Sequence, residues 1–271
     1  MRIEAHAASI VTFMETLEVF RQNGVVTVTM NRPAKKNAIN EAMWQELLDT
    51  FRQIAETDSD RVVVLTGAGG EFCSGADLSA DGARRADRHQ LASMRNISDV
   101  CLALARIPQP TIAKVRGVAV GAGCNMALVC DLVVASSTAR FSEIFSKRGL
   151  SIDFGGSWSL PRRVGLHRAK ELAFFADIIN ATDAEQFGLV NRVLPDAELD
   201  PFVDEWAKRL AVGPPIALAQ TKRLLDQSAT VTLEQALDDE GAAQTINFGT
   251  KDTLEAILAF TEKREPRFIG R

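Results

Sequence analysis

The chain has 271 residues, a formal net charge of −4 and 46% hydrophobic residues. Such a length allows one or two domains of about 100 to 200 residues each, and the composition is typical of a globular protein. Without a basic excess to neutralise phosphates, we expect no nucleic-acid partner. Apolar runs stay well short of the ~20 residues that span a bilayer, so we expect no membrane partner either.

The cysteines and histidines restrict the chemistry further. None of the cysteines has CxxC spacing, and all lie among apolar or small residues, as reduced and packed thiols do. This usage favours the cytoplasm. Of the three histidines, only His167 adjoins sequence that looks ordered, so we expect neither histidine-centred catalysis nor a histidine-ligated metal. Met1 to Thr16 lacks the compact apolar segment of a signal peptide and is predicted to be a short, mobile extension.

The first predicted elements are a β-hairpin and a helix. Leu17–Arg21 and Val25–Met30 flank Asn23-Gly24, a dipeptide that supplies the positive φ angles of a tight turn. Asn40 is placed to cap a helix over Glu41–Ala55, where apolar residues recur at helical spacing. A sheet therefore begins here, followed by an amphipathic helix.

Strands then alternate with helices, which favours an α/β core. The predicted strands are Val62–Thr66, Thr111–Val115 and Leu132–Ala135, and the predicted helices are Gln90–Arg106 and Cys124–Val129. The polar segment from Ser79 to His89 precedes the first of these helices and is expected to be flexible.

The C-terminal part is expected to be helical. Gly213-Pro214-Pro215 marks a break between two of its segments. The predicted helices are Pro201–Ala211, Ile216–Gln227, Leu233–Asn247 and Thr250–Glu262. We therefore divide the chain into a β-rich core over residues 1–195 and a helical region over residues 196–271.

Two turns of small residues each follow a strand and open a helix. They are Phe72–Leu78 and Gly117–Asn125. Small residues let an anion approach the main chain, and free N–H groups at a helix N-terminus carry partial positive charge. Two such N–H groups converging on one oxygen would form an oxyanion hole. Either turn by itself is equally consistent with a structural tight turn.

Three other motifs of catalysis or cofactor binding are matched only in part. The second turn resembles a dinucleotide fingerprint, with Glu143 about 20 residues past Gly123, but Met126 stands where the third glycine belongs. The string Gly155–Ser159 misses the G-x-S-x-G nucleophile elbow at its last residue. Cys73 has no basic partner nearby in sequence, so a packed thiol is favoured over a nucleophile.

A set of short strings stands in a particular order along the chain. They are Asn31-Arg32-Pro33, Asn37-Ala38-Ile39-Asn40, Val64-Leu65-Thr66-Gly67, Cys73-Ser74-Gly75-Ala76-Asp77-Leu78, Gly121-Ala122-Gly123-Cys124, Cys130-Asp131-Leu132 and Ala184-Glu185-Gln186-Phe187-Gly188-Leu189-Val190. Together they resemble the enoyl-CoA hydratase/isomerase (crotonase) family over nearly the whole chain. The resemblance implies an α/β spiral of ββα units with a helical C-terminal trimerisation region. It also implies a thioester carbonyl bound by the N–H groups of Ala76 and Ala122, in a homotrimer or hexamer.

The chain departs from the family's hydratases at their paired glutamates, where it has Asn125 and Phe145. Adding water requires one group to activate the water and another to deliver a proton, which neither residue can do. The segments Phe141–Leu150 and Asp153–Trp158 instead resemble the isomerase branch that includes phenylacetyl-CoA ring-epoxide isomerase. In that branch the aspartate matching Asp153 moves the proton.

These carboxylates also have structural interpretations. Asp153 precedes a Phe-Gly-Gly string and could cap the following helix. Glu143 is a second candidate acid, although strand alternation from Phe141 could equally turn it to solvent. Asp77 and Asp131 are expected to be structural, the first as a cap in its turn and the second in a hydrogen-bonded turn.

For coenzyme A, the resemblance points to the loop containing Lys35, Lys36 and Ala38 and to Phe260 and Lys263 near the C-terminus. Cationic side chains suit phosphates electrostatically. A solvated helix end and trimer packing are the alternatives for the last two residues. No metal or redox cofactor is expected, because coenzyme A enters as part of the substrate.

The leading hypothesis is an enoyl-CoA isomerase in which Asp153 shuttles a proton and Ala76 and Ala122 hold the thioester oxygen. The alternatives are an enoyl-CoA hydratase of fatty acid β-oxidation that uses Glu143 or an orienting Asn125, and a non-catalytic acyl-CoA-binding scaffold. The sequence does not identify the acyl group of the substrate.

Overall fold

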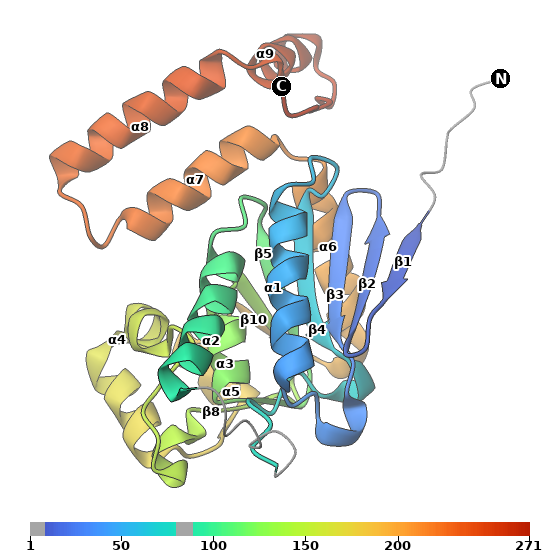
Figure 1. Ribbon diagram of the computed structural model, residues 1–271. Helices are drawn as coiled ribbons and strands as arrows, with labels where there is room; N and C mark the ends of the chain where they lie inside the picture. The colour runs from blue at the N-terminus through green and yellow to red at the C-terminus, as the bar shows by residue number, and fades with distance from the viewer. Residues whose placement is uncertain (1–8, 80–88) are drawn as a thin grey trace.

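The computed structural model describes residues 9–79 and 89–271. Within them, one sheet has the strand order β1-β2-β3-β4-β5-β7-β10 (Figure 1). The pairs among β1, β2 and β3 are antiparallel and the later pairs are parallel. These strands are β1 (Ile10–Phe13), β2 (Leu17–Gln22), β3 (Val25–Met30), β4 (Val62–Gly67), β5 (Thr111–Val115), β7 (Leu132–Ser136) and β10 (Arg192–Leu194). Of the segment predicted to be flexible, residues 80–88 lie outside the described residues.

A smaller sheet and short helices complete the core. The smaller sheet contains β6 (Val118–Val120), β8 (Arg140–Ser142) and β9 (Ile179–Asn180). The short helices are η1 (Pro33–Lys35), η2 (Ala68–Gly70), η3 (Ile144–Arg148) and α5 (Ala181–Gln186). The longer helices of the core are α1 (Glu41–Ala55), α2 (Gln90–Ala105), α3 (Ala122–Val129), α4 (Gly156–Phe175) and α6 (Asp196–Ala211).

The predicted hairpin and first helix are confirmed. Asn23 and Gly24 have φ angles of 52° and 80°, as the tight turn between β2 and β3 requires. The Asn40 side chain accepts a hydrogen bond of 3.0 Å from the Met43 N–H and so caps α1. Part of the predicted N-terminal extension, by contrast, is the strand β1. All its side chains are exposed although three of the four are apolar, so it pairs through main-chain hydrogen bonds without an alternation of buried and exposed positions.

Helices cover both faces of the sheet. The side chains of β4 alternate, with Val63 and Leu65 in the main core and Val62 and Val64 packed against α6 (Figure 1). Helix α6 begins at Asp196, earlier than predicted, because Pro201 lies inside the helix instead of opening it.

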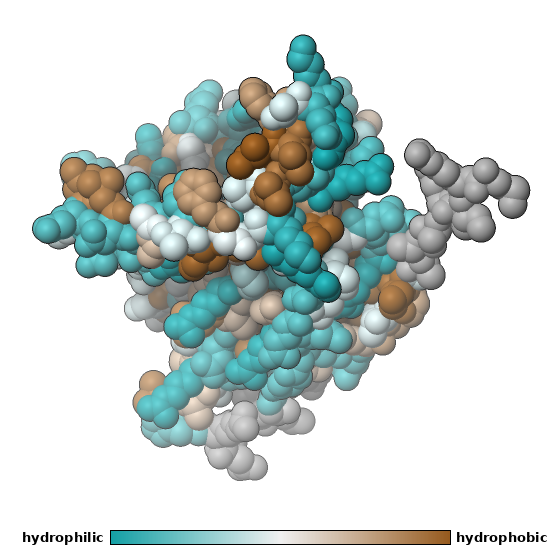
Figure 2. All heavy atoms as spheres, turned by 90° about the horizontal axis from the view of Figure 1, so that it is seen from above, coloured by the Kyte–Doolittle hydropathy of each residue, from teal (hydrophilic) through white to brown (hydrophobic). Residues whose placement is uncertain are grey.

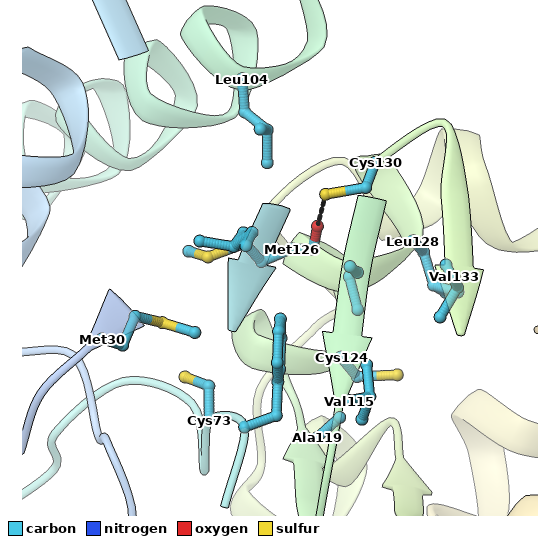
Figure 3. Packing of buried hydrophobic residues seen from close by; sticks show 14 of the residues in the cluster. Met30, Cys73, Leu104, Val115, Ala119, Cys124, Met126, Leu128, Cys130 and Val133 are labelled. Atoms are coloured by element: carbon cyan, nitrogen blue, oxygen red, sulfur yellow. Dashed lines mark hydrogen bonds between the residues drawn. The ribbon is translucent and has the colours of Figure 1, made fainter. Parts of the chain in front are cut away.

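The main core surrounds α3, which is almost entirely buried and, apart from Asn125, made of apolar or small residues. In Figure 3, Met30 of β3, Leu104 of α2 and Met126 of α3 lie around the same buried space. Helix α4 is the helix assumed to follow Asp153, but its bounds were not predicted. It contains Pro161, and its helical geometry is interrupted at Gly165, which has a φ of 75°, so no helical period is visible in the sequence.

The C-terminal helices α7 (Pro215–Gln227), α8 (Leu233–Phe248) and α9 (Lys251–Glu262) match the predicted segments within two residues or fewer. They lie at the end of the sheet opposite to the loops that follow β3 and β4 (Figure 1). Apolar side chains gather over these helices when the molecule is seen from that end (Figure 2). The exposed ones include Leu225, Leu233, Leu237, Phe248, Leu254 and Phe260.

Candidate active site

The two small-residue turns are joined by main-chain hydrogen bonds. Cys73 donates its N–H to the Val118 oxygen at 2.8 Å, and Val120 donates to the Cys73 oxygen at 2.9 Å. On the other side of the first turn, Ile39 donates to the Gly75 oxygen at 2.8 Å. Ala76 is thereby held next to the point where β6 leads into α3.

The glycines of these turns allow a close approach of main chains. Gly75 has a φ of 94°, and a Cβ there would lie 2.9 Å from the Val120 oxygen and 3.8 Å from the Ala122 nitrogen. Ala122 is the first residue of α3, so its N–H has no partner within the helix. Among residues 9–79 and 89–271, neither the Ala76 nor the Ala122 N–H donates a hydrogen bond. Two free amides therefore lie in adjacent turns, an arrangement that can receive an oxygen carrying negative charge.

Asn125 lies one turn further along α3 and is fully buried. Its Nδ2 donates to Glu143 Oε2 at 3.2 Å and to the main-chain oxygen of Asp153 at 2.9 Å. The start of α4 comes equally close, because a Cβ at Gly156 would lie 2.3 Å from Asn125 Nδ2. A single amide thus links the segments that carry both candidate acids.

Asp153 does not cap the following helix. The N-cap of α4 is Gly155, and no side chain caps it. Burial raises the pKa of the Asp153 carboxyl from 3.8 to about 6. Its Oδ1 is buried and has no partner among the described residues. A carboxyl with this pKa can take up and release a proton near neutral pH.

Glu143 points inward, so the solvent-facing interpretation is wrong. The residue is 3% exposed, because the chain leaves β8 at Ser142 and no longer alternates as a strand. Burial raises the pKa of its carboxyl from 4.5 to about 7, against hydrogen bonds from Asn125 and Cys124, and the nearby Asp153 raises it further.

Unpaired polar atoms gather around α3 and the start of α4. In the part of the chain that the structure describes, they include Asn125 Oδ1, Glu143 Oε1, Asp153 Oδ1 and Ser159 Oγ. Buried polar atoms are normally hydrogen-bonded, so this group of unpaired atoms makes the region a candidate functional site. From the sequence, Ser159 was considered only as the end of a failed nucleophile motif, because a lone serine carries no signal for a buried polar cluster.

The remaining candidates have structural environments. Cys73 is a packed thiol whose pKa burial raises to about 12. Asp77 accepts a hydrogen bond from the Ser79 N–H and pairs with Arg32 at 3.0 Å. Asp131 is structural, as expected, but its contacts are not those of a local turn: it accepts from the main chain and hydroxyl of Thr111 on β5 and pairs with Lys222 at 2.9 Å.

The residues implied in coenzyme A binding fall into two separate groups. Lys36, with a φ of 48°, pairs with Glu71 at 2.9 Å, and Lys35 and Ala38 lie in the same loop. Phe260, which is 87% exposed, lies on α9, and Lys263 is the C-cap residue that follows this helix. Figure 1 shows this loop and α9 at opposite ends of the sheet, so the structure does not bring them together in one chain. Their roles stay predictions.

Within the described residues, no group of three or more His, Cys, Asp or Glu side chains is placed to hold a metal ion. Nor does any described helix have the length and apolar character needed to cross a membrane.

The enoyl-CoA hydratase/isomerase family matches residues 20–271 of the chain. The protein belongs to this family. The crystal structure of an enoyl-CoA hydratase from Mycobacterium smegmatis superposes with a TM-score of 0.87 at 36% identity, covering 94% of this chain and 99% of that one. The crotonase fold expected from the sequence is therefore confirmed.

Relatives in the family include proteins named as isomerases and proteins named as hydratases. The chain is 36% identical to 1,2-epoxyphenylacetyl-CoA isomerase of Escherichia coli over 261 residues, which cover 95% of this chain and 100% of the relative. It is also 36% identical to 2,3-dehydroadipyl-CoA hydratase of Escherichia coli over 259 residues, again 95% of this chain and 100% of the relative. Family membership confirms the expected resemblance and leaves the reaction to be argued from the site.

Proposed function

We propose that this protein is an acyl-CoA isomerase that moves a double bond through a thioester enolate. The observation that carries the proposal is the Asp153 carboxyl, whose buried Oδ1 is unpaired. Its pKa of about 6 lets it accept a proton and return it near neutral pH. The segment that carries it is tied to Asn125, one turn of α3 beyond the free Ala122 amide.

The reaction follows from these positions. The N–H groups of Ala76 and Ala122 hold the thioester oxygen of a 3-enoyl-CoA. Ionised Asp153 removes a proton from C2, and the electrons of the broken C–H bond form an enolate whose negative oxygen the two amides stabilise. The protonated Asp153 then delivers the same proton to C4. The double bond moves from C3–C4 to C2–C3, with no change in mass and no added cofactor.

A hydratase is the second candidate, because Glu143 supplies a carboxyl near Asp153 that could form the pair water addition needs. Asn125 and Phe145, at the positions of the usual glutamates, weigh against it. The isomerase needs one proton-moving carboxylate, which Asp153 provides.

The assembly is part of the proposal. Exposed apolar residues on α7 to α9 support a homotrimer or hexamer, since a monomer would leave this surface in water. Coenzyme A contacts by both the Lys35–Ala38 loop and Phe260 would then come from different subunits. A cytoplasmic location, expected from the reduced cysteines, also remains a prediction.

Product masses test the proposal. Purified protein is incubated with a 3-enoyl-CoA and, separately, with a 2-enoyl-CoA, beside the Asp153→Asn variant. Conversion of the first substrate to the conjugated isomer without mass change, absent in the variant, is expected. Gain of one water by the second substrate would establish the hydratase. Binding of both thioesters without turnover or α-proton exchange would establish the scaffold.

A further inference from the structure

Glu143 is a buried acid to which the proposed reaction assigns no task. It lies at the end of β8, is 3% exposed, and receives a hydrogen bond of 3.2 Å from Asn125 Nδ2. The same Nδ2 holds the main-chain oxygen of Asp153 at 2.9 Å. The other carboxyl oxygen, Glu143 Oε1, is buried and has no partner among the described residues. The protonation state of Glu143 therefore affects the hydrogen bonds of Asn125, the side chain that holds the segment of Asp153.

The titratable neighbours of Glu143 come from two directions. Helix α3 contributes the Cys124 thiol, which hydrogen-bonds to Glu143, and the neutral Asn125. The segment before α4 contributes Asp153, a second acid. No described base lowers the pKa of Glu143, so both carboxyls lack a counter-ion there.

Several cations on the adjacent elements have partners elsewhere. On η3, Lys147 pairs with Asp177 at 2.9 Å. The positive charge of Arg140 on β8 lowers the pKa of Glu71. On α4, Arg163 donates to the main-chain oxygens of Leu128 and Cys130, and Arg162 stacks on Trp158. Two carboxyls buried close together without a cation resist ionising together.

We propose that Glu143 is a positioning residue for Asp153: it is uncharged in the active enzyme, and loss of its proton switches the site off. The neutral acid keeps Asn125 in place and adds no negative charge beside Asp153 and the enolate. Once ionised, it opposes both the second carboxylate and the developing enolate oxygen. The inference rests on the proposed function of Asp153.

The first test is the pH dependence of 3-enoyl-CoA isomerisation between pH 5 and pH 9. Wild type is expected to gain activity as Asp153 ionises and to lose about tenfold in rate for each pH unit above about 7, where Glu143 ionises. Glu143→Gln keeps a hydrogen-bond acceptor for Asn125 and cannot ionise, so its rate is expected to stay level at high pH. Glu205→Gln, at an exposed site on α6, is the matched control and should follow wild type.

Two results would overturn the inference. An identical alkaline fall in Glu143→Gln would show that another group causes it. Complete loss of activity at every pH in a folded Glu143→Gln protein would make Glu143 a proton-transferring group itself. If that variant does not fold, Glu143→Met, which is neutral but offers Asn125 only a weak acceptor, is expected to have a lower rate at every pH and to lack the alkaline fall.

A second measurement does not depend on catalysis. The folded protein binds the Glu143 proton more tightly than the unfolded chain, so this residue lowers stability as pH rises from 4.5 to about 7. The Tm of Glu143→Gln is therefore expected to match wild type near pH 4 and exceed it at pH 8. An unchanged difference between these pH values overturns the inference. An inactive wild type that keeps this Tm difference refutes the isomerase but supports the neutral, buried Glu143.

Discussion

Asp153→Asn is expected to abolish isomerisation and at the same time to stabilise the protein at alkaline pH. Burial raises the pKa of the Asp153 carboxyl, so the folded protein holds this proton more tightly than the unfolded chain. The free energy of unfolding therefore falls as pH rises from 3.8 to about 6, and the loss is complete above that range. Asparagine has nearly the same shape and carries no charge, so it avoids this loss.

The size of the effect follows from the pKa. The rise from 3.8 to about 6 corresponds to about 3 kcal/mol, at about 1.4 kcal/mol for each pKa unit. Asp153 is only partly buried, and solvent screening reduces the effect to about 1 to 2 kcal/mol. For a chain of this size, that amounts to a rise in Tm of about 2 to 8 °C.

Thermal unfolding followed by circular dichroism, at one protein concentration, provides the assay. The Tm of Asp153→Asn should equal that of wild type at pH 4 and exceed it at pH 8. Asp177→Asn is the control, because that exposed carboxylate pairs with Lys147 at the surface and should change Tm little. A variant no more stable than wild type at pH 8 would refute the desolvation of Asp153, and full isomerase activity in it would refute its catalytic role.

Three further predictions concern packing, thiol reactivity and assembly. Gly156→Ala would place a Cβ 2.3 Å from Asn125 Nδ2 and should lower the free energy of unfolding by about 1 to 3 kcal/mol in urea; an unchanged midpoint would contradict this close approach. Cys73, with a pKa of about 12, should escape iodoacetamide at pH 8 until the protein unfolds, as peptide mass spectrometry would show. Leu237→Asp with Phe248→Asp should reduce the mass in light scattering from an oligomer to a monomer; an unchanged mass would place the interface elsewhere.

Much of the fold could be predicted from local signals. The Asn23-Gly24 turn, the Asn40 cap and the apolar period of α1 each act over a few residues, and the structure has all three. Elements whose stability depends on distant contacts were missed or left without bounds. The strand β1 relies on pairing with β2, and α4 contains a proline and a glycine that conceal its helical period.

The residues of the candidate site likewise include some that the sequence predicted and others that only the structure revealed. Glycine and alanine strings identified the turns at Ala76 and Ala122, because small residues are required where main chains approach closely. The sequence alone also identified Asp153 as a candidate through its match to a known pattern.

Local sequence by itself thus determined the turns, the caps and most of the helices, since these depend on the φ preferences and hydrogen bonds of neighbouring residues. Only the tertiary structure decided that Glu143 faces inward, that Asn125 joins it to Asp153, and that Asp153 leaves the helix cap to Gly155. Those facts depend on contacts between residues 18 and 28 positions apart, and on burial that raises the pKa of both acids, neither of which a short pattern records.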